Sequence, residues 1–181
     1  MNLPNKITLA RIILVPVFLA IISIKIKYGH FLAAGLFILA ASTDGLDGYF
    51  ARKRNQVTKL GKFMDPLADK LLVSAALISL VELDKITAWV AFVIIGREFA
   101  VTGLRSIAAA DGIVISASKL GKLKTISQIV AIVFLLIQDF PFSLLNIPIG
   151  KISMGVAVFF TIWSGLDYFK RARHLLKAGQ K

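Results

Sequence analysis

Apolar residues occur in six long runs along the chain, separated by shorter polar stretches. The runs cover residues 7–26, 31–50, 67–83, 86–109, 126–140 and 152–168. A helix needs about 20 apolar residues to cross the hydrocarbon core of a bilayer. The pattern therefore predicts an all-α protein, a bundle of six transmembrane helices.

The third and fifth runs are short for a membrane span. We expect both helices to extend into their basic flanks, at residues 61–66 and 119–125. Residues 141–148 begin and end with proline and contain Asn146, which is typical of a loop. The chain contains no internal repeat, and we expect a single domain over residues 1–181.

Composition supports the membrane interpretation. Hydrophobic residues make up 57% of the chain and charged residues 18%, a balance that is unusual for a soluble domain. The net charge of +12 would suggest nucleic acid in a soluble protein. Here the basic residues lie between apolar runs, so we expect a lipid bilayer and no nucleic acid. The chain has no cysteine, which excludes disulfides and thiolate metal sites.

The basic residues are concentrated in alternate connections. They follow the second, fourth and sixth apolar runs, whereas the other connections hold few. Cytoplasmic loops carry such an excess of lysine and arginine. We therefore expect a multi-pass protein of the cell membrane, with both termini and the basic loops in the cytoplasm.

Four carboxylates lie inside or next to apolar runs, where an unpaired charge is costly. Asp44 and Asp47 are three residues apart, and Asp65 and Asp69 are four apart. On helices each pair shares a face. The connection between the pairs is long enough for the two helices to fold together, so all four could face one polar cavity.

Oxygen ligands of this kind suit a hard cation such as Mg²⁺, Mn²⁺ or Ca²⁺. Four carboxylates fit two metal ions that clamp a phosphoryl group. Gly48 and Ala51 leave room for a ligand near the backbone, Arg52 suits a phosphate, and Thr58 offers a hydroxyl. Spacing alone leaves one alternative open, a proton or cation relay in a transporter.

The segment from Asp44 to Asp69 resembles the signature of the CDP-alcohol phosphotransferase family. That signature, D-x2-D-G-x2-A-R-x8-G-x3-D-x3-D, is filled at every defined position, including Gly61. The resemblance implies a six-helix membrane fold, usually a homodimer, with a cytoplasmic active site. Such enzymes transfer a phosphatidyl or similar group from a CDP-linked donor to an alcohol and release CMP.

The resemblance also implies roles for individual residues. Asp44, Asp47, Asp65 and Asp69 would bind two divalent cations, Mg²⁺ or Mn²⁺, and Asp69 would also take the proton of the acceptor hydroxyl. The donor, CDP-diacylglycerol, would be bound by the remaining signature residues, by Thr58 and by an N-terminal element that is also similar to the family. The residues of this predicted donor site are Asn5, Thr8, Arg11, Gly48, Ala51, Arg52, Thr58 and Gly61.

A second group of basic residues bears on the acceptor. Residues 96–105 and 120–125 resemble the branch of the family that makes phosphatidylglycerophosphate. Arg97 and Glu98 lie in the middle of an apolar run, where charge is costly; an ion pair between them is the structural alternative. A cationic cluster suits a phosphorylated acceptor. The predicted acceptor-phosphate residues are Arg97, Arg105, Lys119, Lys122 and Lys124.

The hypothesis from the sequence is thus a metal-dependent transferase of phospholipid biosynthesis. It would move the phosphatidyl group of CDP-diacylglycerol to sn-glycerol 3-phosphate. Inositol phosphate, serine or phosphatidylglycerol remain possible acceptors within the family. A small cation transporter and a non-catalytic scaffold are the alternatives outside it.

Overall fold

The computed structural model describes residues 3–24, 26–53, 59–110, 112 and 119–178. Within these ranges the chain forms six α-helices, one short 3-10 helix and no strand. The helices are α1 (Leu3–Ser23), α2 (Gly29–Lys53), α3 (Lys59–Glu82), α4 (Ala88–Ala110), α5 (Lys119–Leu136), η1 (Phe142–Leu145) and α6 (Ile149–Ala178). The all-α prediction is confirmed.

The helix starts match the sequence expectations at the two short runs, whereas α5 ends at Leu136, before the end of the run 126–140. α3 begins at Lys59 and α5 at Lys119, so both helices include their basic flanks. The expected loop at residues 141–148 contains η1. α6 is longer than its apolar run and continues to Ala178.

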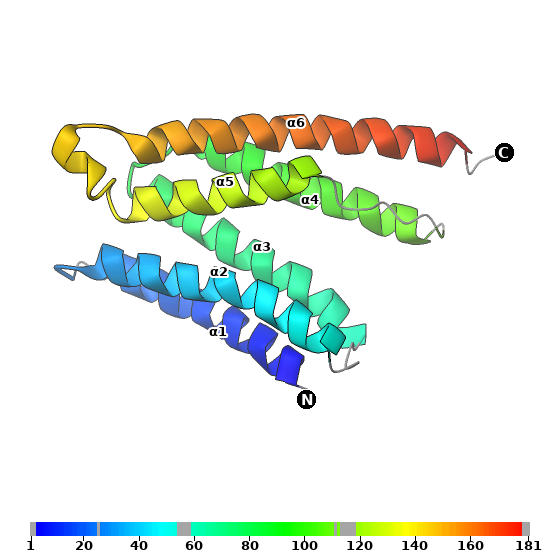
Figure 1. Ribbon diagram of the computed structural model, residues 1–181, viewed down its shortest axis with the longest axis horizontal. Coiled ribbons are helices and arrows are strands. Elements are labelled where there is room, and N and C mark those ends of the chain that lie inside the picture. Colours follow the sequence, from blue (N-terminus) through cyan, green and yellow to red (C-terminus); the bar gives the residue numbers. More distant parts are fainter. Residues whose placement is uncertain (1–2, 25, 54–58, 111, 113–118, 179–181) are drawn as a thin grey trace.

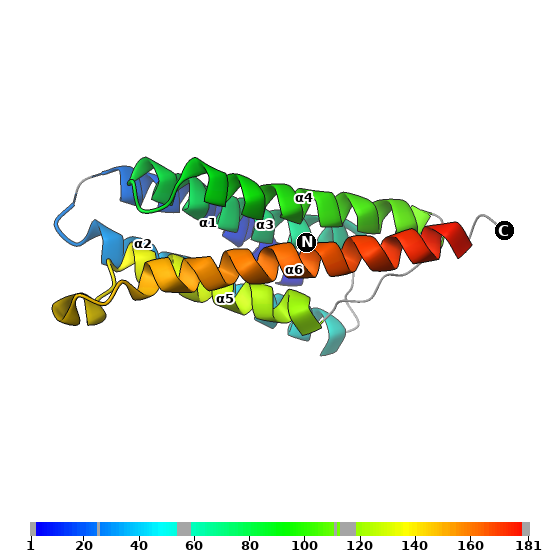
Figure 2. The same cartoon turned by 90° about the horizontal axis from the view of Figure 1, so that it is seen from above.

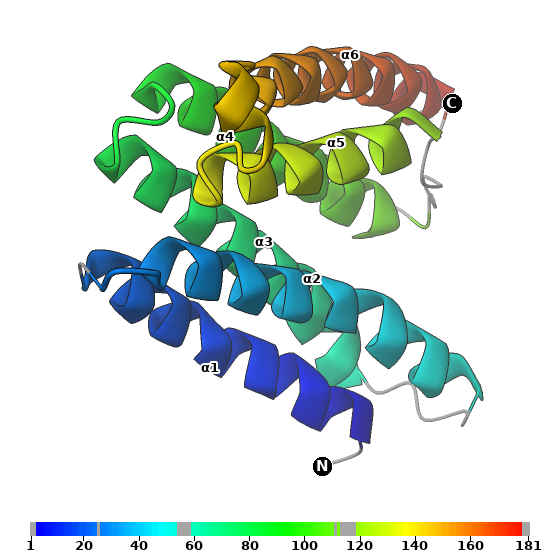
Figure 3. The same ribbon diagram turned by 60° about the vertical axis from the view of Figure 1, so that its left-hand side comes forward.

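Successive helices run in alternating directions, and α3 lies at the centre of the bundle. α3 contacts α1, α2, α4 and α5, while α6 packs on α4 and α5. Figure 3 shows α3 between the α1–α2 pair and the group formed by α4, α5 and α6. The start of α1 and the end of α6 both point away from η1 (Figure 1). A residue on α3 can therefore face either half of the bundle.

Small residues line the contacts between helices. Alanines from five of the helices are fully or almost fully buried, among them Ala33, Ala76, Ala91, Ala131 and Ala157. Small side chains let helix backbones approach closely, which is the usual packing of helices in membranes. Larger side chains fill the spaces between these contacts; Phe18 of α1 packs against Phe37 of α2 with ring centroids 6.3 Å apart.

Large apolar side chains point outward over much of the described surface. Trp89 is 77% exposed and Phe92 66% exposed. An extensive apolar exterior is the pattern expected of a membrane protein. Two of the described helices are long and apolar enough, taken alone, to cross a bilayer: Asn5–Ser23 in α1 and Ile149–Lys170 in α6. In α2 the described apolar stretch, Gly29–Thr43, is shorter than such a span.

α5 and α6 are fastened together at the η1 end of the bundle. The backbone N–H of Gly150 donates to Asp139 Oδ1 over 2.5 Å. A Cβ atom at residue 150 would lie 2.7 Å from that oxygen and 2.8 Å from Leu135 Cδ2. Only glycine fits this contact without displacement. Figure 2 shows η1 and this connection at the end of the molecule opposite the C-terminus.

Candidate active site

A pocket of about 500 Å³ opens between α3, α4, α5 and α6, near the end that points away from η1. Two acidic and five basic side chains line it: Asp69, Glu98, Lys70, Arg97, Arg105, Lys122 and Lys124. The lining thus has a net charge of +3. Such a concentration of charge in an otherwise apolar bundle indicates a site for an anionic ligand.

The pocket brings together one acidic and four basic residues that were predicted from the sequence as site residues. Asp69, the predicted base, comes from α3, and Arg97 and Arg105 come from α4. Lys122 and Lys124 come from the first turns of α5. These groups lie far apart in the sequence, and the packing of α3, α4 and α5 makes them neighbours. The side chain of Lys119 lies outside the described part of the structure.

Glu98 is the centre of an ion-pair cluster at the inner wall of the pocket. Its Oε1 atom accepts from Lys124 Nζ over 2.5 Å and from Arg97 Nη1 over 2.9 Å. Arg97 also donates from Nη2 to Ser164 Oγ over 2.9 Å, and its guanidinium lies 5.6 Å from the ring centroid of Tyr168. The ion pair between Arg97 and Glu98, given above as the structural alternative, is present, and Lys124 binds the same carboxylate oxygen.

This cluster divides the basic residues into two kinds. Arg97 and Lys124 are buried or half-buried and share one carboxylate, so part of their charge is neutralised inside the protein. Arg105 and Lys122 are exposed at the pocket mouth. A charged ligand that arrives from solvent therefore meets Arg105 and Lys122 first.

The N-terminal polar residues are buried in the bundle. Asn5 is 6% exposed, Thr8 0% and Arg11 1%. Thr8 Oγ1 donates to Asp65 Oδ1 over 2.5 Å, and Arg11 Nε donates to Thr43 Oγ1 over 3.3 Å. Thr43 immediately precedes Asp44 in α2. The N-terminal element of α1 thus contacts α3 at Asp65, a predicted metal ligand, and α2 at Thr43, next to another. The spacing of residues along α1 could not reveal these partners.

Several predicted residues cannot be located at the level of side chains. Asp44, Asp47, Gly48, Ala51 and Arg52 belong to α2, but beyond the helical backbone they lie outside the described part of the structure, as does all of Thr58. Gly61 is buried near the start of α3. Within the described part of the chain no three acidic, histidine or cysteine side chains are close enough to hold a metal; two of the four predicted ligands fall outside that part.

The site also contains polar residues that the sequence interpretation missed. Lys70, Thr102, Thr125, Gln128, Ser164 and Tyr168 line the pocket or hold its walls. The signal for Gln128 was present, since it is a polar residue in the apolar run 126–140. Lys70, Thr102 and Ser164 carry the same signal, since each is a polar residue within one of the apolar runs, and Thr125 lies in the segment 120–125. The place of Tyr168 at the pocket follows from the packing of the helices.

Comparison with known proteins places this geometry in context. The sequence profile described as "CDP-alcohol phosphatidyltransferase" matches residues 1–163. A protein of Bacillus subtilis (strain 168), named CDP-diacylglycerol–glycerol-3-phosphate 3-phosphatidyltransferase, is 52% identical over 97% of this chain and 97% of its own. Proteins with the same name from Rickettsia typhi (strain ATCC VR-144 / Wilmington) and Pseudomonas fluorescens are 40% and 37% identical, over 95% and 100% of this chain and 97% and 95% of theirs.

Proposed function

The chain belongs to the CDP-alcohol phosphatidyltransferase family, and we propose that it transfers the phosphatidyl group of CDP-diacylglycerol to sn-glycerol 3-phosphate. The products are phosphatidylglycerophosphate and CMP. The names of its full-length relatives support this activity. The observation that carries it in this chain is the pocket that joins Asp69 to the basic residues of α4 and α5.

The charge of that pocket favours a phosphorylated acceptor. Its lining carries a net charge of +3, which complements the phosphate of glycerol 3-phosphate. Serine, whose ammonium and carboxylate groups cancel, would gain little from this excess. Arginine and lysine bind phosphate oxygens through charge-assisted hydrogen bonds. The acceptor phosphate therefore lies, in this proposal, between Arg105 and Lys122.

The mechanism begins with the acceptor hydroxyl beside Asp69. The Asp69 carboxylate takes the proton of the primary hydroxyl while the hydroxyl oxygen attacks the β-phosphorus of CDP-diacylglycerol. An oxygen–phosphorus bond forms, and the bond between that phosphorus and the oxygen of CMP breaks. The basic residues fix the distal phosphate, so that the nucleophile is held next to the base.

The family resemblance adds two divalent cations to this proposal. Asp44, Asp47, Asp65 and Asp69 would hold Mg²⁺ or Mn²⁺, because carboxylate oxygens are the ligands that these ions prefer. When bound, the ions would neutralise the diphosphate and make CMP a better leaving group. Asp65 and Asp69 lie one turn apart on α3, and Thr8 fixes one oxygen of Asp65. The donor set is chemically suited to such ions.

The donor site and the topology complete the proposal. Gly48, Ala51, Arg52, Thr58 and Gly61 would line the CDP group, with Asn5 and Arg11 behind them. We propose six membrane spans, cytoplasmic termini and a homodimer, with the pocket opening to the cytoplasm. The concentration of basic residues near one end of the bundle supports this orientation.

The activity is tested with purified protein, labelled CDP-diacylglycerol and a panel of acceptors. CMP release is expected with glycerol 3-phosphate and a divalent cation. Inositol phosphate, serine and phosphatidylglycerol are expected to give little. A preference for any of these three would contradict the proposed acceptor, and ion flux in liposomes without CMP release would support a transporter instead.

Replacing Arg105 by alanine is expected to weaken acceptor binding selectively. Loss of one charge-assisted hydrogen bond to phosphate costs about 1.5–3 kcal/mol, so the KM for glycerol 3-phosphate should rise about ten- to a hundredfold. The KM for CDP-diacylglycerol should stay within about twofold if Arg105 contacts only the acceptor. Steady-state kinetics with each substrate varied in turn measure both. The control is Lys151→Ala, which removes an exposed cation in the first turn of α6, away from the pocket. Equal effects of Arg105→Ala on both KM values would argue against an acceptor site at Arg105.

Replacing Thr8 by valine is expected to raise the requirement for metal. Valine has the shape of threonine but cannot donate to Asp65, so this carboxylate loses its orientation. Loss of such a supporting contact typically lowers metal affinity about 10- to 100-fold. The Mn²⁺ concentration that gives half-maximal CMP release should rise, and excess Mn²⁺ should restore the rate. Thr161→Val, which removes a buried bond within α6, should leave the Mn²⁺ curve in place. An unchanged curve for Thr8→Val would rule out the orienting role.

A further inference from the structure

Gln128 is a buried amide whose nitrogen has no partner among the described residues. It lies on α5 and is 2% exposed, and its Nε2 atom makes no hydrogen bond to any part of the chain that the structure describes. A buried polar group without a partner costs free energy, and most such groups in proteins are satisfied. The unsatisfied donor therefore requires an explanation, and a bound ligand supplies one.

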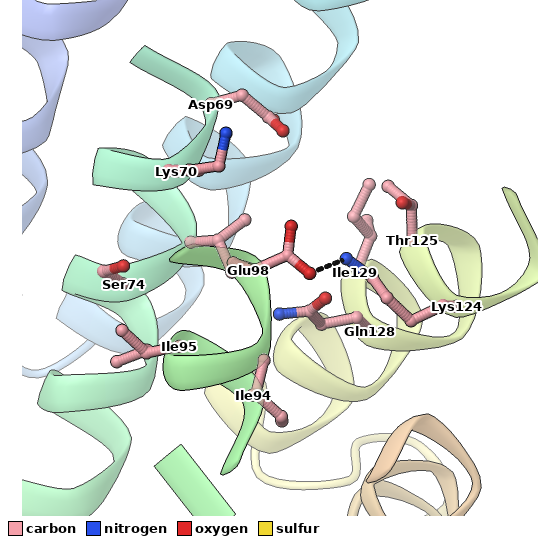
Figure 4. Close-up of a pocket in the computed structure, with 11 residues that line it drawn as sticks. Asp69, Lys70, Ser74, Ile94, Ile95, Glu98, Lys124, Thr125, Gln128 and Ile129 are labelled. Atoms are coloured by element: carbon pink, nitrogen blue, oxygen red, sulfur yellow. Dashed lines mark hydrogen bonds and ion pairs between the residues drawn. The ribbon is translucent and has the colours of Figure 1, made fainter. Parts of the chain in front are cut away.

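Gln128 lines a small recess that adjoins the main pocket. The recess measures about 20 Å³, and Asp69, Lys70, Glu98, Lys124 and Thr125 line both spaces. Figure 4 shows the Gln128 side chain extending from α5 toward α4, with its amide next to the Glu98 carboxylate. A volume of this size holds about one water-sized group. The recess can thus accept a hydroxyl, but it is too small for a phosphate.

The chemistry of the recess also favours a neutral hydroxyl. Val73, Ile94, Ile95 and Ile129 form its apolar walls. The Glu98 oxygen Oε1 already accepts from Lys124 and Arg97. An amide N–H that lacks a partner can donate to a hydroxyl oxygen, and a hydroxyl brings no charge into the apolar walls.

We propose that Gln128 binds the hydroxyl of the acceptor that does not react, the one on C2 of glycerol 3-phosphate. This inference rests on the proposed function. Asp69 lines both spaces, so the C1 hydroxyl can meet the base while the adjacent C2 hydroxyl enters the recess. The C3 phosphate then extends toward Arg105 and Lys122. Gln128 is in this role a specificity residue that distinguishes a diol phosphate from a simple alcohol phosphate.

The test compares two acceptors, sn-glycerol 3-phosphate and 3-hydroxypropyl phosphate. The second keeps the primary hydroxyl and the phosphate but lacks the C2 hydroxyl. Wild-type protein is expected to prefer glycerol 3-phosphate by about ten- to a hundredfold in kcat/KM, because the analogue leaves the amide unpaired. Gln128→Met keeps the length of the side chain without the amide. It should bring the preference close to one, mainly by slowing glycerol 3-phosphate.

Val130→Met places the same new side chain on the exposed face of α5 and should keep the wild-type preference. A preference that survives in Gln128→Met overturns the inference. The wild-type ratio of the two kcat/KM values gives an answer even if Gln128→Met does not fold. A ratio near one means that no group binds the C2 hydroxyl, and this result by itself overturns the inference. Absence of CMP release with both acceptors overturns the proposed function, and this inference with it.

Discussion

Asp69→Asn is expected to lower kcat for CMP release by about 10³-fold or more. A positioned general base contributes about 10²–10⁴-fold, and an asparagine amide cannot take the hydroxyl proton. Asparagine keeps the size of the side chain, so the α3 backbone and the pocket wall should persist. The measurement is the single-turnover rate with saturating glycerol 3-phosphate, together with the thermal unfolding midpoint in detergent.

Asp84→Asn is the matched control for this substitution. Asp84 is an exposed carboxylate in the turn after α3, with a φ of 54° that asparagine readily adopts. Its variant should turn over at the wild-type rate. If Asp69→Asn retained activity within a few-fold of wild type while folded, Asp69 would not be the base.

Glu98→Gln is expected to destabilise the folded protein by about 3 kcal/mol. Glu98 is the carboxylate shared by Lys124 and Arg97, whose side chains are 6% and 12% exposed. Removing one partner of a buried ion pair leaves an uncompensated charge, which typically costs about 3–5 kcal/mol. Glutamine can accept one hydrogen bond but cannot neutralise Lys124. Chemical unfolding in detergent micelles measures the change in the free energy of unfolding.

A double variant separates the charge effect from a general loss of packing. Combining Glu98→Gln with Lys124→Met removes the orphaned ammonium and should recover part of the lost stability. Glu82→Gln, an exposed residue in the last turn of α3, should change stability by less than about 0.5 kcal/mol. A Glu98→Gln variant as stable as Glu82→Gln would show that the cluster contributes nothing to folding.

Apolar runs predicted the helices because each helix keeps an apolar exterior and an apolar interface along most of its length. The extension of α3 and α5 through Gly61 and Lys122 was also predicted, and it holds although Pro66 lies inside α3. The loop at 141–148 was correctly placed, but η1 inside it depends on short local hydrogen bonds that leave little trace in hydropathy.

The signature and the resemblance of the second basic segment suggested the site, and the packing of helices decided its details. The resemblance assigned Asn5, Thr8 and Arg11 of α1 to the binding of CDP-diacylglycerol. The described contacts of Thr8 and Arg11 are with Asp65 and Thr43. A periodic pattern identifies a face, but only the packing of α1 on α2 and α3 determines what that face meets.

The same limit applies to Glu98. The sequence showed a costly charge next to Arg97, for which an ion pair within α4 was the simplest alternative. Lys124 lies 26 positions away along the chain, and it joins the pair because α4 and α5 both pack against α3 and α6. No local pattern connects the two.

The hydrogen bond between Gly150 and Asp139 holds the η1 end of α5 close to the start of α6. With 18 residues and a rise of 1.5 Å per residue, α5 is about 27 Å long. A tilt of about 5° at the fastened end would move the other end, which carries Lys122, by about 2 Å. That displacement is comparable to the difference between a formed and a broken hydrogen bond. The close contact at Gly150 therefore helps to keep Lys122 in place, together with the packing of α5 on α6, α2 and α3.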